Sequence, residues 1–134
     1  MNEEQTRDLE KLGRSTVDAV VGLVDALLAA EEADDQDAID KAQEAIQEDP
    51  LHVQVRGDWH SPGESADLSE YNILLGWGGP AMRIIGELNE CDEPETAKVE
   101  TQDWFTPWVE FYDTTEEEDE KLLRYAGCFY YREG

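Results

Sequence analysis

Residues 69–88 read SEYNILLGWGGPAMRIIGEL. Two mainly apolar runs, 69–76 and 81–88, flank a segment of four residues that contains two glycines and a proline. Runs rich in β-branched and aromatic residues favour strands, and Gly and Pro mark the turn between them. This stretch therefore predicts two antiparallel strands joined by a tight turn.

Further strands are expected on both sides of this pair. Residues 51–56 alternate between apolar and polar positions and predict a strand, followed by a loop with the sequence GDWHSPGES. After a turn over 89–94, we expect strands at 96–103, 108–112 and 128–132. Thr115 and Glu118 form a capping-box pattern, which predicts a short helix from there to about Ala126, ended by Gly127.

The chain before Trp59 contains none of the twelve aromatic residues and is rich in Ala, Leu, Val, Asp and Glu, which suits helices. Asn2 and Gln5 resemble a capping box, so a helix is predicted from there to about Ala30. Its apolar stripe consists of Leu9, Leu12, Thr16, Val20, Leu23, Val24 and Leu27, widened by Val17, Val21 and Leu28. A second helix is predicted over 35–47, capped by Asp34 and stopped by Pro50.

These elements predict an α+β fold with an N-terminal helical hairpin over 1–50 and a β-rich part over 51–134. The β-rich part should hold an antiparallel sheet of four to six strands and a short C-terminal helix near 115–126, and helices should pack on one face of the sheet. At 134 residues the chain is expected to form a single domain, 1–134, with its own hydrophobic core.

The composition is dominated by acids: 34 Asp and Glu against 10 Lys and Arg give a formal net charge of -24. A domain of this size needs a net charge of only about 2–8 for solubility, and the excess costs stability through self-repulsion. Duplex DNA carries about 24 charges over roughly 40 Å of its length. A compact chain of this size has a diameter of roughly 36 Å, so its charge is comparable to that of a DNA segment of its own length.

The charge and the motifs exclude several classes of function. Repulsion disfavours binding to nucleic acid and to anionic membranes, and the longest apolar run, 19–30, is too short to span a bilayer. The N-terminal sequence MNEEQTRDLEKL does not resemble a signal peptide, so a cytoplasmic protein is expected. Cys91 and Cys128 match no metal or redox spacing and are expected to be free thiols. No catalytic residue, cofactor or metal site is predicted, and the chain is not expected to be an enzyme.

The candidate binding residues are acids that could replace phosphates in a partner's groove. On the second predicted helix the acids lie within one arc of about 80°, opposite Ile39, Ala42 and Ile46. Acids one helical turn apart lie about 5–6 Å from each other, near the separation of phosphates along a strand of DNA. Glu95 and Glu100 could extend such a row on the sheet, and the run over 116–120 could form a second contact surface. The predicted partner-binding residues are Asp37, Asp40, Glu44, Glu48, Glu95, Glu100, Glu116, Glu117, Asp119 and Glu120.

Each of these features also has a purely structural explanation. Any amphipathic surface helix exposes acids, and Lys41 could pair with Asp37. The macrodipole stabilises acids in the first turns of a helix, which is sufficient to explain the run over 116–120. His52 and His60 lack a third metal ligand, and residues 76–80 lack the ending of a phosphate-binding loop.

Two further features favour structural roles. The aromatic segment 104–108 (WFTPW) is more typical of a core than of a site, although one or two of its rings could be exposed as anchors for a partner. Arg83 is the lone base within 81–88 and should neutralise neighbouring acids.

The patterns ILLGWGGPAMRIIGEL and QDWFTPW, with the closing LLRYAGCFYYRE, resemble small hypothetical proteins encoded by phages and plasmids. The resemblance covers roughly 69–131 and implies no biochemical role or site residue. An origin in a mobile element fits acidic DNA mimics that block host restriction enzymes or CRISPR effector complexes. The chain is similar to those inhibitors in size, charge and aromatic content, but that class shares no motif or fold.

The leading hypothesis is therefore a DNA-mimic inhibitor that blocks the DNA-binding groove of a basic nucleic-acid-binding protein, a CRISPR effector complex or a restriction complex. One alternative is a small binding module adapted to high salt, in which the acidity serves solubility. Another is an immunity protein for a basic nuclease toxin. The sequence leaves the target and the oligomeric state, monomer or dimer, open.

Overall fold

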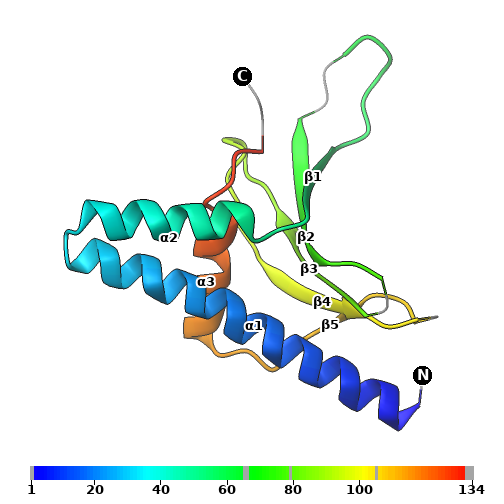
Figure 1. Cartoon of the computed structure of the whole chain (residues 1–134). Coiled ribbons are helices and arrows are strands. Elements are labelled where there is room, and N and C mark those ends of the chain that lie inside the picture. Colours follow the sequence, from blue (N-terminus) through cyan, green and yellow to red (C-terminus); the bar gives the residue numbers. More distant parts are fainter. Residues whose placement is uncertain (1, 65–66, 79, 105, 132–134) are drawn as a thin grey trace.

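The computed structural model describes residues 2–64, 67–78, 80–104 and 106–131, and it has an α+β fold (Figure 1). Two helices, a five-stranded sheet and a third helix follow one another along the chain. The predicted hairpin, the number of strands and the C-terminal helix are confirmed. The predicted strand at 128–132 is wrong over its described residues, 128–131, and the predicted cap of the second helix is wrong as well.

The helices are α1 (Glu3–Glu32), α2 (Gln36–Glu48) and α3 (Glu116–Ala126). The expected capping boxes are present at both α1 and α3, and Gly127 is the C-cap of α3. In each box the cap side chain accepts a hydrogen bond from the backbone N–H of the residue three positions later. The side chain of that later residue in turn accepts a hydrogen bond from the backbone N–H of the cap residue. These bonds satisfy N–H groups that a helix start otherwise leaves unpaired.

The N-cap of α2 is Asp35, one residue after the expected Asp34. The Asp35 side chain accepts a hydrogen bond from the backbone N–H of Ala38 at 3.3 Å. Asp34 instead takes a left-handed conformation, with φ of 51°, in the tight link between α1 and α2. Aspartate is a favoured N-cap residue at either position, so the geometry of the link between α1 and α2 decides that Asp35 rather than Asp34 caps the helix.

The strands are β1 (His52–Gly57), β2 (Leu68–Gly76), β3 (Ala81–Glu87), β4 (Lys98–Gln102) and β5 (Val109–Glu110). They form an antiparallel meander in chain order, β1-β2-β3-β4-β5. The fourth and fifth strands are shorter than predicted. The predicted turn over 89–94 is present, and it is closed by a bridge between Leu88 and Pro94.

The register gives the sheet two different faces, because residues paired across neighbouring strands share a face. On the inner face, Val53 pairs with Ile73, Ile73 with Ile84, and Ile84 with Val99. All three helices lie on this side of the sheet (Figure 1). On the outer face, Leu74 pairs with Arg83 and Arg83 with Glu100, and no helix of the described residues covers these positions.

The core is one cluster that joins the helices to the inner face. Val17, Val20 and Val24 of α1 are at most 1% exposed. The cluster also includes the following buried residues of the other elements: Ala42 and Ile46 of α2; Tyr71, Ile73, Ile84 and Val99 of the sheet; and Leu122, Tyr125 and Ala126 of α3. The apolar stripe expected for α1 is confirmed at its centre, whereas Leu28 at its margin is exposed.

Residues 128–131 form no strand, and residue 132 lies outside the described residues. The segment turns back onto the end of α3 instead. The Tyr131 hydroxyl donates a hydrogen bond to the carbonyl of Ala126 at 2.6 Å, and its ring lies 5.1 Å from that of Tyr71. The Phe129 ring packs edge-on against Tyr125 at 5.4 Å. Phe129 and Tyr131 therefore pack on the core, and the described part of the segment pairs with no strand.

Among the described helices, none is both long enough and apolar enough to cross a membrane.

Gly13 lies where α1 makes its closest approach to the chain beyond β5. A Cβ atom built at Gly13 would lie 2.4 Å from the Phe111 ring, whereas one built at Gly22 meets nothing within 4 Å. Both residues lie inside the same helix, so they have the same intrinsic preference for alanine.

We predict opposite effects for alanine at these two positions. Gly13→Ala should destabilise the protein by about 1–3 kcal/mol, because the ring of Phe111 must move. Gly22→Ala should stabilise it by about 0.5–1 kcal/mol, through the gain in helix propensity. Denaturant unfolding of both variants measures the difference. Equal effects of the two substitutions would show that Phe111 does not pack on α1 in this way.

Candidate functional site

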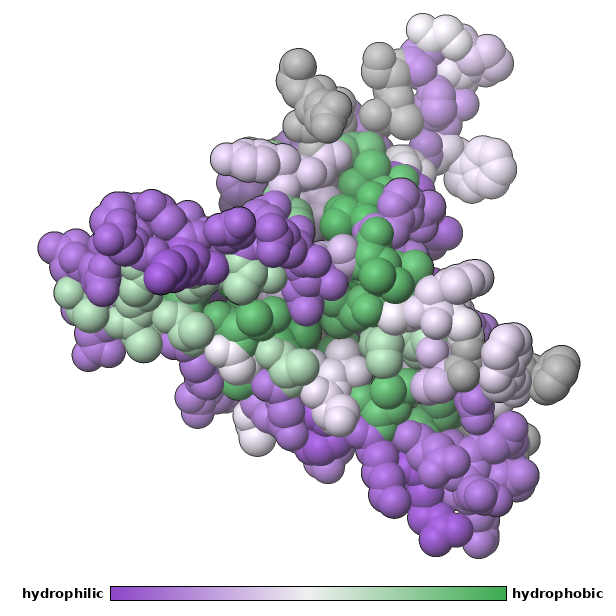
Figure 2. Space-filling model, in the orientation of Figure 1, coloured by the Kyte–Doolittle hydropathy of each residue, from purple (hydrophilic) through white to green (hydrophobic). Residues whose placement is uncertain are grey.

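The first candidate surface is the α2 acidic row, which consists of Asp37, Asp40, Glu44 and Glu48. All four side chains are exposed, while Ala42 and Ile46 on the opposite face of α2 are buried against α1. Figure 2 shows hydrophilic side chains gathered over the outward side of α2. The packing of one face therefore fixes the direction in which the row points.

The α2 acidic row has almost no compensating charge. Residues 34–49 contain seven acids and one base, Lys41. The expected pair between Lys41 and Asp37 is not formed, and no ion pair between described residues involves any acid of the row. Asp40 accepts one hydrogen bond, from the Gln36 side chain at 2.8 Å.

Six of the nine Lys and Arg residues in the described part of the chain form ion pairs away from α2. On the outer face of the sheet, Arg56 pairs with Glu70, Arg83 with Glu100 and Lys98 with Glu110. Between α1 and α3, the ion pairs are Arg14–Glu118, Lys121–Asp25 and Arg124–Glu31. These pairs join elements that must pack together, so the negative charge of α2 is left facing solvent.

The second candidate surface is the α3 acidic cluster, which consists of Glu116, Glu117, Asp119 and Glu120. All four are exposed in the first turns of α3, where the helix dipole favours negative charge. Glu117 pairs with Lys121 at 3.1 Å, and Asp119 accepts a hydrogen bond from the Thr114 hydroxyl at 2.6 Å. Part of this cluster is therefore engaged in starting the helix.

Glu118, in the middle of the run, has a structural role. Its carboxylate accepts hydrogen bonds from the Thr115 backbone N–H and from the Arg14 guanidinium. These two contacts, in that order of importance, lower the pKa of Glu118 below its ordinary value. The carboxylate is 20% exposed and links the start of α3 to α1.

Glu95 lies in the connection between β3 and β4, where its backbone N–H donates to the carbonyl of Glu87 at 2.8 Å. Together with Glu116, Asp119 and Glu120 it lines a cavity of about 500 Å³ between this connection, β5 and α3. The structure therefore groups Glu95 with the α3 acidic cluster. Only the fold creates this grouping, because at least twenty residues separate the two in the sequence.

The expected row of Glu95 and Glu100 on one strand is not present. Glu95 precedes β4, which begins at Lys98, and Glu100 lies within β4 on the outer face. The Arg83 Nε donates to Glu100 at 2.8 Å, as expected for a base that neutralises a neighbouring acid. The Arg83 guanidinium also lies over the Trp108 ring, 4.1 Å from its centre. Glu100 is thus held in an internal pair rather than presented to a partner.

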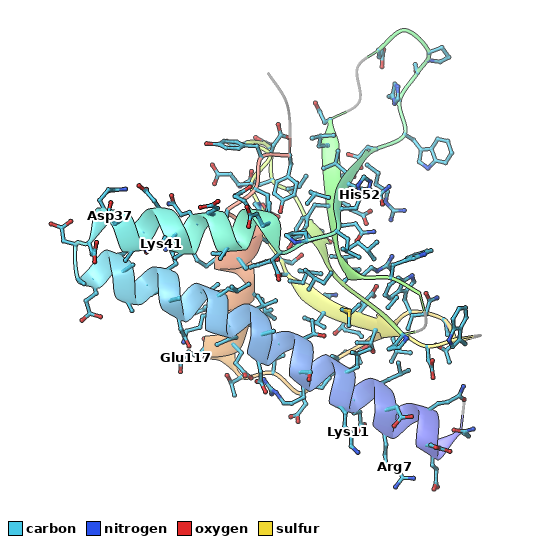
Figure 3. All side chains as sticks on the ribbon, viewed as in Figure 1. Arg7, Lys11, Asp37, Lys41, His52 and Glu117 are labelled. Atoms are coloured by element: carbon cyan, nitrogen blue, oxygen red, sulfur yellow. The ribbon has the colours of Figure 1, made fainter. Side chains whose placement is uncertain are left out.

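The two acidic surfaces point in different directions. In Figure 3, Asp37 and Lys41 lie on one side of α1, and Glu117 lies on the other. The predicted binding residues therefore form two separate surfaces, the α2 acidic row and the α3 acidic cluster with Glu95.

Three tryptophans are exposed, and two of them, Trp77 and Trp104, lie in neighbouring connections, which the sequence analysis did not predict. Trp77, in the turn between β2 and β3, is 74% exposed, and Trp104, between β4 and β5, is 60% exposed. Of the two explanations of segment 104–108, the exposure of Trp104 agrees with the alternative in which one or two rings are exposed rather than part of the core. Trp108 is half-buried under Arg83, and residue 105 lies outside the described residues. The Gly and Pro residues beside these rings, as in WGGP, were the available signal, because loops keep such residues at the surface.

The remaining candidates show no assembled site. His52 and His60 are both exposed, and no group of three His, Cys, Asp or Glu side chains within the described part of the chain is arranged to hold a metal ion. Cys91 and Cys128 are free thiols, the first exposed and the second half-buried.

Comparison with known proteins gives no match to any family model, curated protein or solved structure. The resemblance of residues 69–131 to small proteins of phages and plasmids therefore stays a prediction. The candidate surfaces rest on their own geometry and charge.

We predict that Glu118 and Glu117, adjacent in sequence, differ in their contribution to stability. Glu118→Gln keeps a side chain that can complete the capping box but removes the charge opposite Arg14, so it should cost about 1 kcal/mol at pH 7. Because the pKa of Glu118 is lowered in the folded state, this contribution is present above its unfolded pKa and is lost as the pH falls through the folded pKa.

Unfolding curves between pH 7 and pH 2 measure this effect, with Glu117→Gln as the matched control. The Glu117 side chain is 76% exposed, so its loss should change stability by less than about 0.5 kcal/mol at any pH. A deficit of Glu118→Gln that persists unchanged at pH 2 would contradict the assigned role of the carboxylate charge.

Proposed function

We propose that this protein is an acidic DNA mimic that occupies the DNA-binding groove of a host defence complex, a CRISPR effector or a restriction enzyme. The observation that carries the proposal is the α2 acidic row, Asp37, Asp40, Glu44 and Glu48, which is exposed and has no paired base among the described residues. The net charge of -24 supports it, since solubility alone needs far less.

The dimensions of the row suit a groove that normally holds a nucleic-acid backbone. From Asp37 to Glu48 the helix rises roughly 16 Å, at 1.5 Å per residue. One strand of DNA carries about five phosphates over that length, at 3.4 Å each, and the row offers four carboxylates. Lys and Arg side chains that receive phosphates can therefore receive these acids with small adjustments of their flexible stems.

The proposed mechanism is occupation of the groove, without a chemical step, in the cytoplasm of the host cell. The whole-molecule field attracts the basic groove over long range and raises the rate of encounter. The α2 acidic row then pairs with bases that lose water at the contact, which slows dissociation. The α3 acidic cluster with Glu95 points elsewhere and serves as a second contact, for a groove that curves around the protein.

The proposal predicts that DNA and this protein compete for the partner. A captured effector or restriction complex should bind the protein more weakly as its own target DNA is added, and the affinity should fall as the salt concentration rises. Neutralising the row, by Asp37→Asn with Asp40→Asn, Glu44→Gln and Glu48→Gln, should weaken binding by at least about tenfold. Each buried interfacial charge contact that is broken costs roughly 2–5 kcal/mol, so this is a lower limit.

A matched variant removes the same number of charges away from the row. Asp58, Glu64, Asp67 and Glu90 are all exposed in the connections at the opposite end of the sheet from the tryptophans, and their neutralisation tests the effect of total charge alone. This control should retain most of the affinity. Simultaneous binding of target DNA and protein, or equal losses in the two variants, would refute mimicry by the α2 acidic row.

A further inference from the structure

One end of the sheet presents two indole rings to solvent. Trp77 lies in the β2–β3 turn, and Trp104 lies in the β4–β5 connection. The two connections are neighbours, because Ala81 at the start of β3 pairs with Gln102 at the end of β4. Both lie at the end of the sheet opposite the long β1–β2 loop (Figure 1). We call this pair of rings the tryptophan end.

The backbone around Trp104 is held in place. The Trp104 backbone N–H donates to the Asp103 carboxylate at 2.8 Å, and the Asp103 N–H donates to the Thr106 hydroxyl at 3.0 Å. The Gln102 side chain donates to the Thr106 carbonyl at 3.1 Å. Thr106 is itself buried, so this network anchors the connection on the sheet. The backbone that carries the Trp104 ring is therefore held before a partner binds, which reduces the backbone entropy lost on binding.

The same end of the sheet already contains an arginine bound to an indole. The Arg83 guanidinium lies 4.1 Å from the centre of the Trp108 ring and pairs with Glu100. This arrangement, a cation between an aromatic face and a carboxylate, is favourable because the ring quadrupole and the acid both attract the charge. Trp77 and Trp104 have the same chemistry on their exposed faces, but neither ring has an arginine over it among the residues that the structure describes.

Charged side chains of both signs lie at this end of the sheet, and the acids outnumber the bases. Asp103 is adjacent to Trp104 in sequence, and the first turns of α1 lie beside Thr101 and Val109 at this end. Those turns carry the acids Glu3, Glu4, Asp8 and Glu10 and the bases Arg7 and Lys11. Figure 3 shows Arg7 and Lys11 at the start of α1, and both line a cavity together with Thr101 and Val109 of the sheet. The local balance of charge is therefore negative, as it is for the whole molecule.

We propose that the tryptophan end docks an arginine-bearing segment of the partner, with one guanidinium stacked on Trp77 and another on Trp104. The inference deepens the proposed function, since it rests on the partner being basic and names a contact that DNA mimicry alone does not supply. The negative charge of the protein attracts the basic segment, and the two rings then bind arginine in preference to lysine. The selection arises because a planar, weakly hydrated guanidinium stacks on an indole, whereas a strongly hydrated ammonium does so less well.

Other occupants fit the charges less well. A second copy of the chain carries the same net charge of -24 and is repelled, and a nucleic acid is repelled for the same reason. A purely apolar segment would gain from the rings but nothing from the nearby carboxylates. An arginine-bearing segment satisfies both features at once.

The test uses two acetylated and amidated peptides, hexa-arginine and hexa-lysine, which have equal charge. Hexa-arginine should bind the protein about two- to fivefold more tightly than hexa-lysine, because each exposed cation–π contact contributes a factor of roughly two to five and lysine retains part of it. In the Trp77→Ala/Trp104→Ala variant this preference should disappear. Trp59 is fully exposed in the β1–β2 loop at the other end of the sheet, so Trp59→Ala is the matched control and should retain the preference.

A second measurement needs no variant. The four tryptophans give four indole N–H signals in an NMR spectrum, and hexa-arginine should shift those of Trp77 and Trp104 while leaving that of Trp59 in place. Equal affinities of the two peptides, equal shifts at all indoles, or formation of dimers that the double variant abolishes would each overturn the inference.

The peptide test of the tryptophan end can fail or succeed independently of the DNA-competition test of the proposed function. Loss of arginine selectivity leaves competition with target DNA untouched, and absence of that competition leaves the peptide preference untouched. Raising the salt concentration separates the contributions further. The double tryptophan variant should lower affinity for hexa-arginine with an unchanged salt dependence, whereas neutralising the α2 acidic row should reduce that dependence.

Discussion

The apolar face of α1 is the constraint on which the rest of this structure depends. Val17, Val20 and Val24 are almost completely buried, and α2, α3 and the inner face of the sheet all pack on the cluster that contains them. The apolar inner face of the five-stranded meander must be buried against another layer. The long helix supplies the second layer and also fixes the positions of the other two helices.

This packing must overcome the repulsion among the acids, and the distribution of the bases shows how it does so. The recorded ion pairs lie across neighbouring strands of the sheet, within α1 and α3, and between those two helices. Positive charge is thus placed where elements must approach each other closely. The α2 acidic row receives none of it, because α2 is held through Ala42 and Ile46 and needs no charge contact for its packing. The α2 acidic row is therefore one of the surfaces on which unpaired negative charge remains.

The exposed acids of the two acidic surfaces and the rings of the tryptophan end act through different physical interactions. Interactions of exposed carboxylates act over long distances and weaken with salt, so they govern encounter more than selectivity. Stacking on an indole ring acts only at contact and is far less sensitive to salt. A protein that has both can attract any basic surface and still retain one partner in preference to others, which net charge alone does not achieve.

The sequence by itself determined the fold class, the capping boxes of α1 and α3, the central strands and the outward direction of the α2 acidic row. These features follow from local periodicity and from hydrogen bonds between residues three apart, which act before any tertiary contact forms. Tertiary structure alone decided three other features. It grouped Glu95 with the acids of α3, it paired Glu100 with Arg83, and it placed residues 128–131 against Tyr71 and Tyr125 instead of in a strand. The exposure of the Trp104 ring is a further feature of this kind, because the sequence shows that an indole is present but only the surrounding packing decides which face of the ring meets solvent. In each case the deciding contact joins residues that periodicity does not relate, so no pattern along the chain contains it.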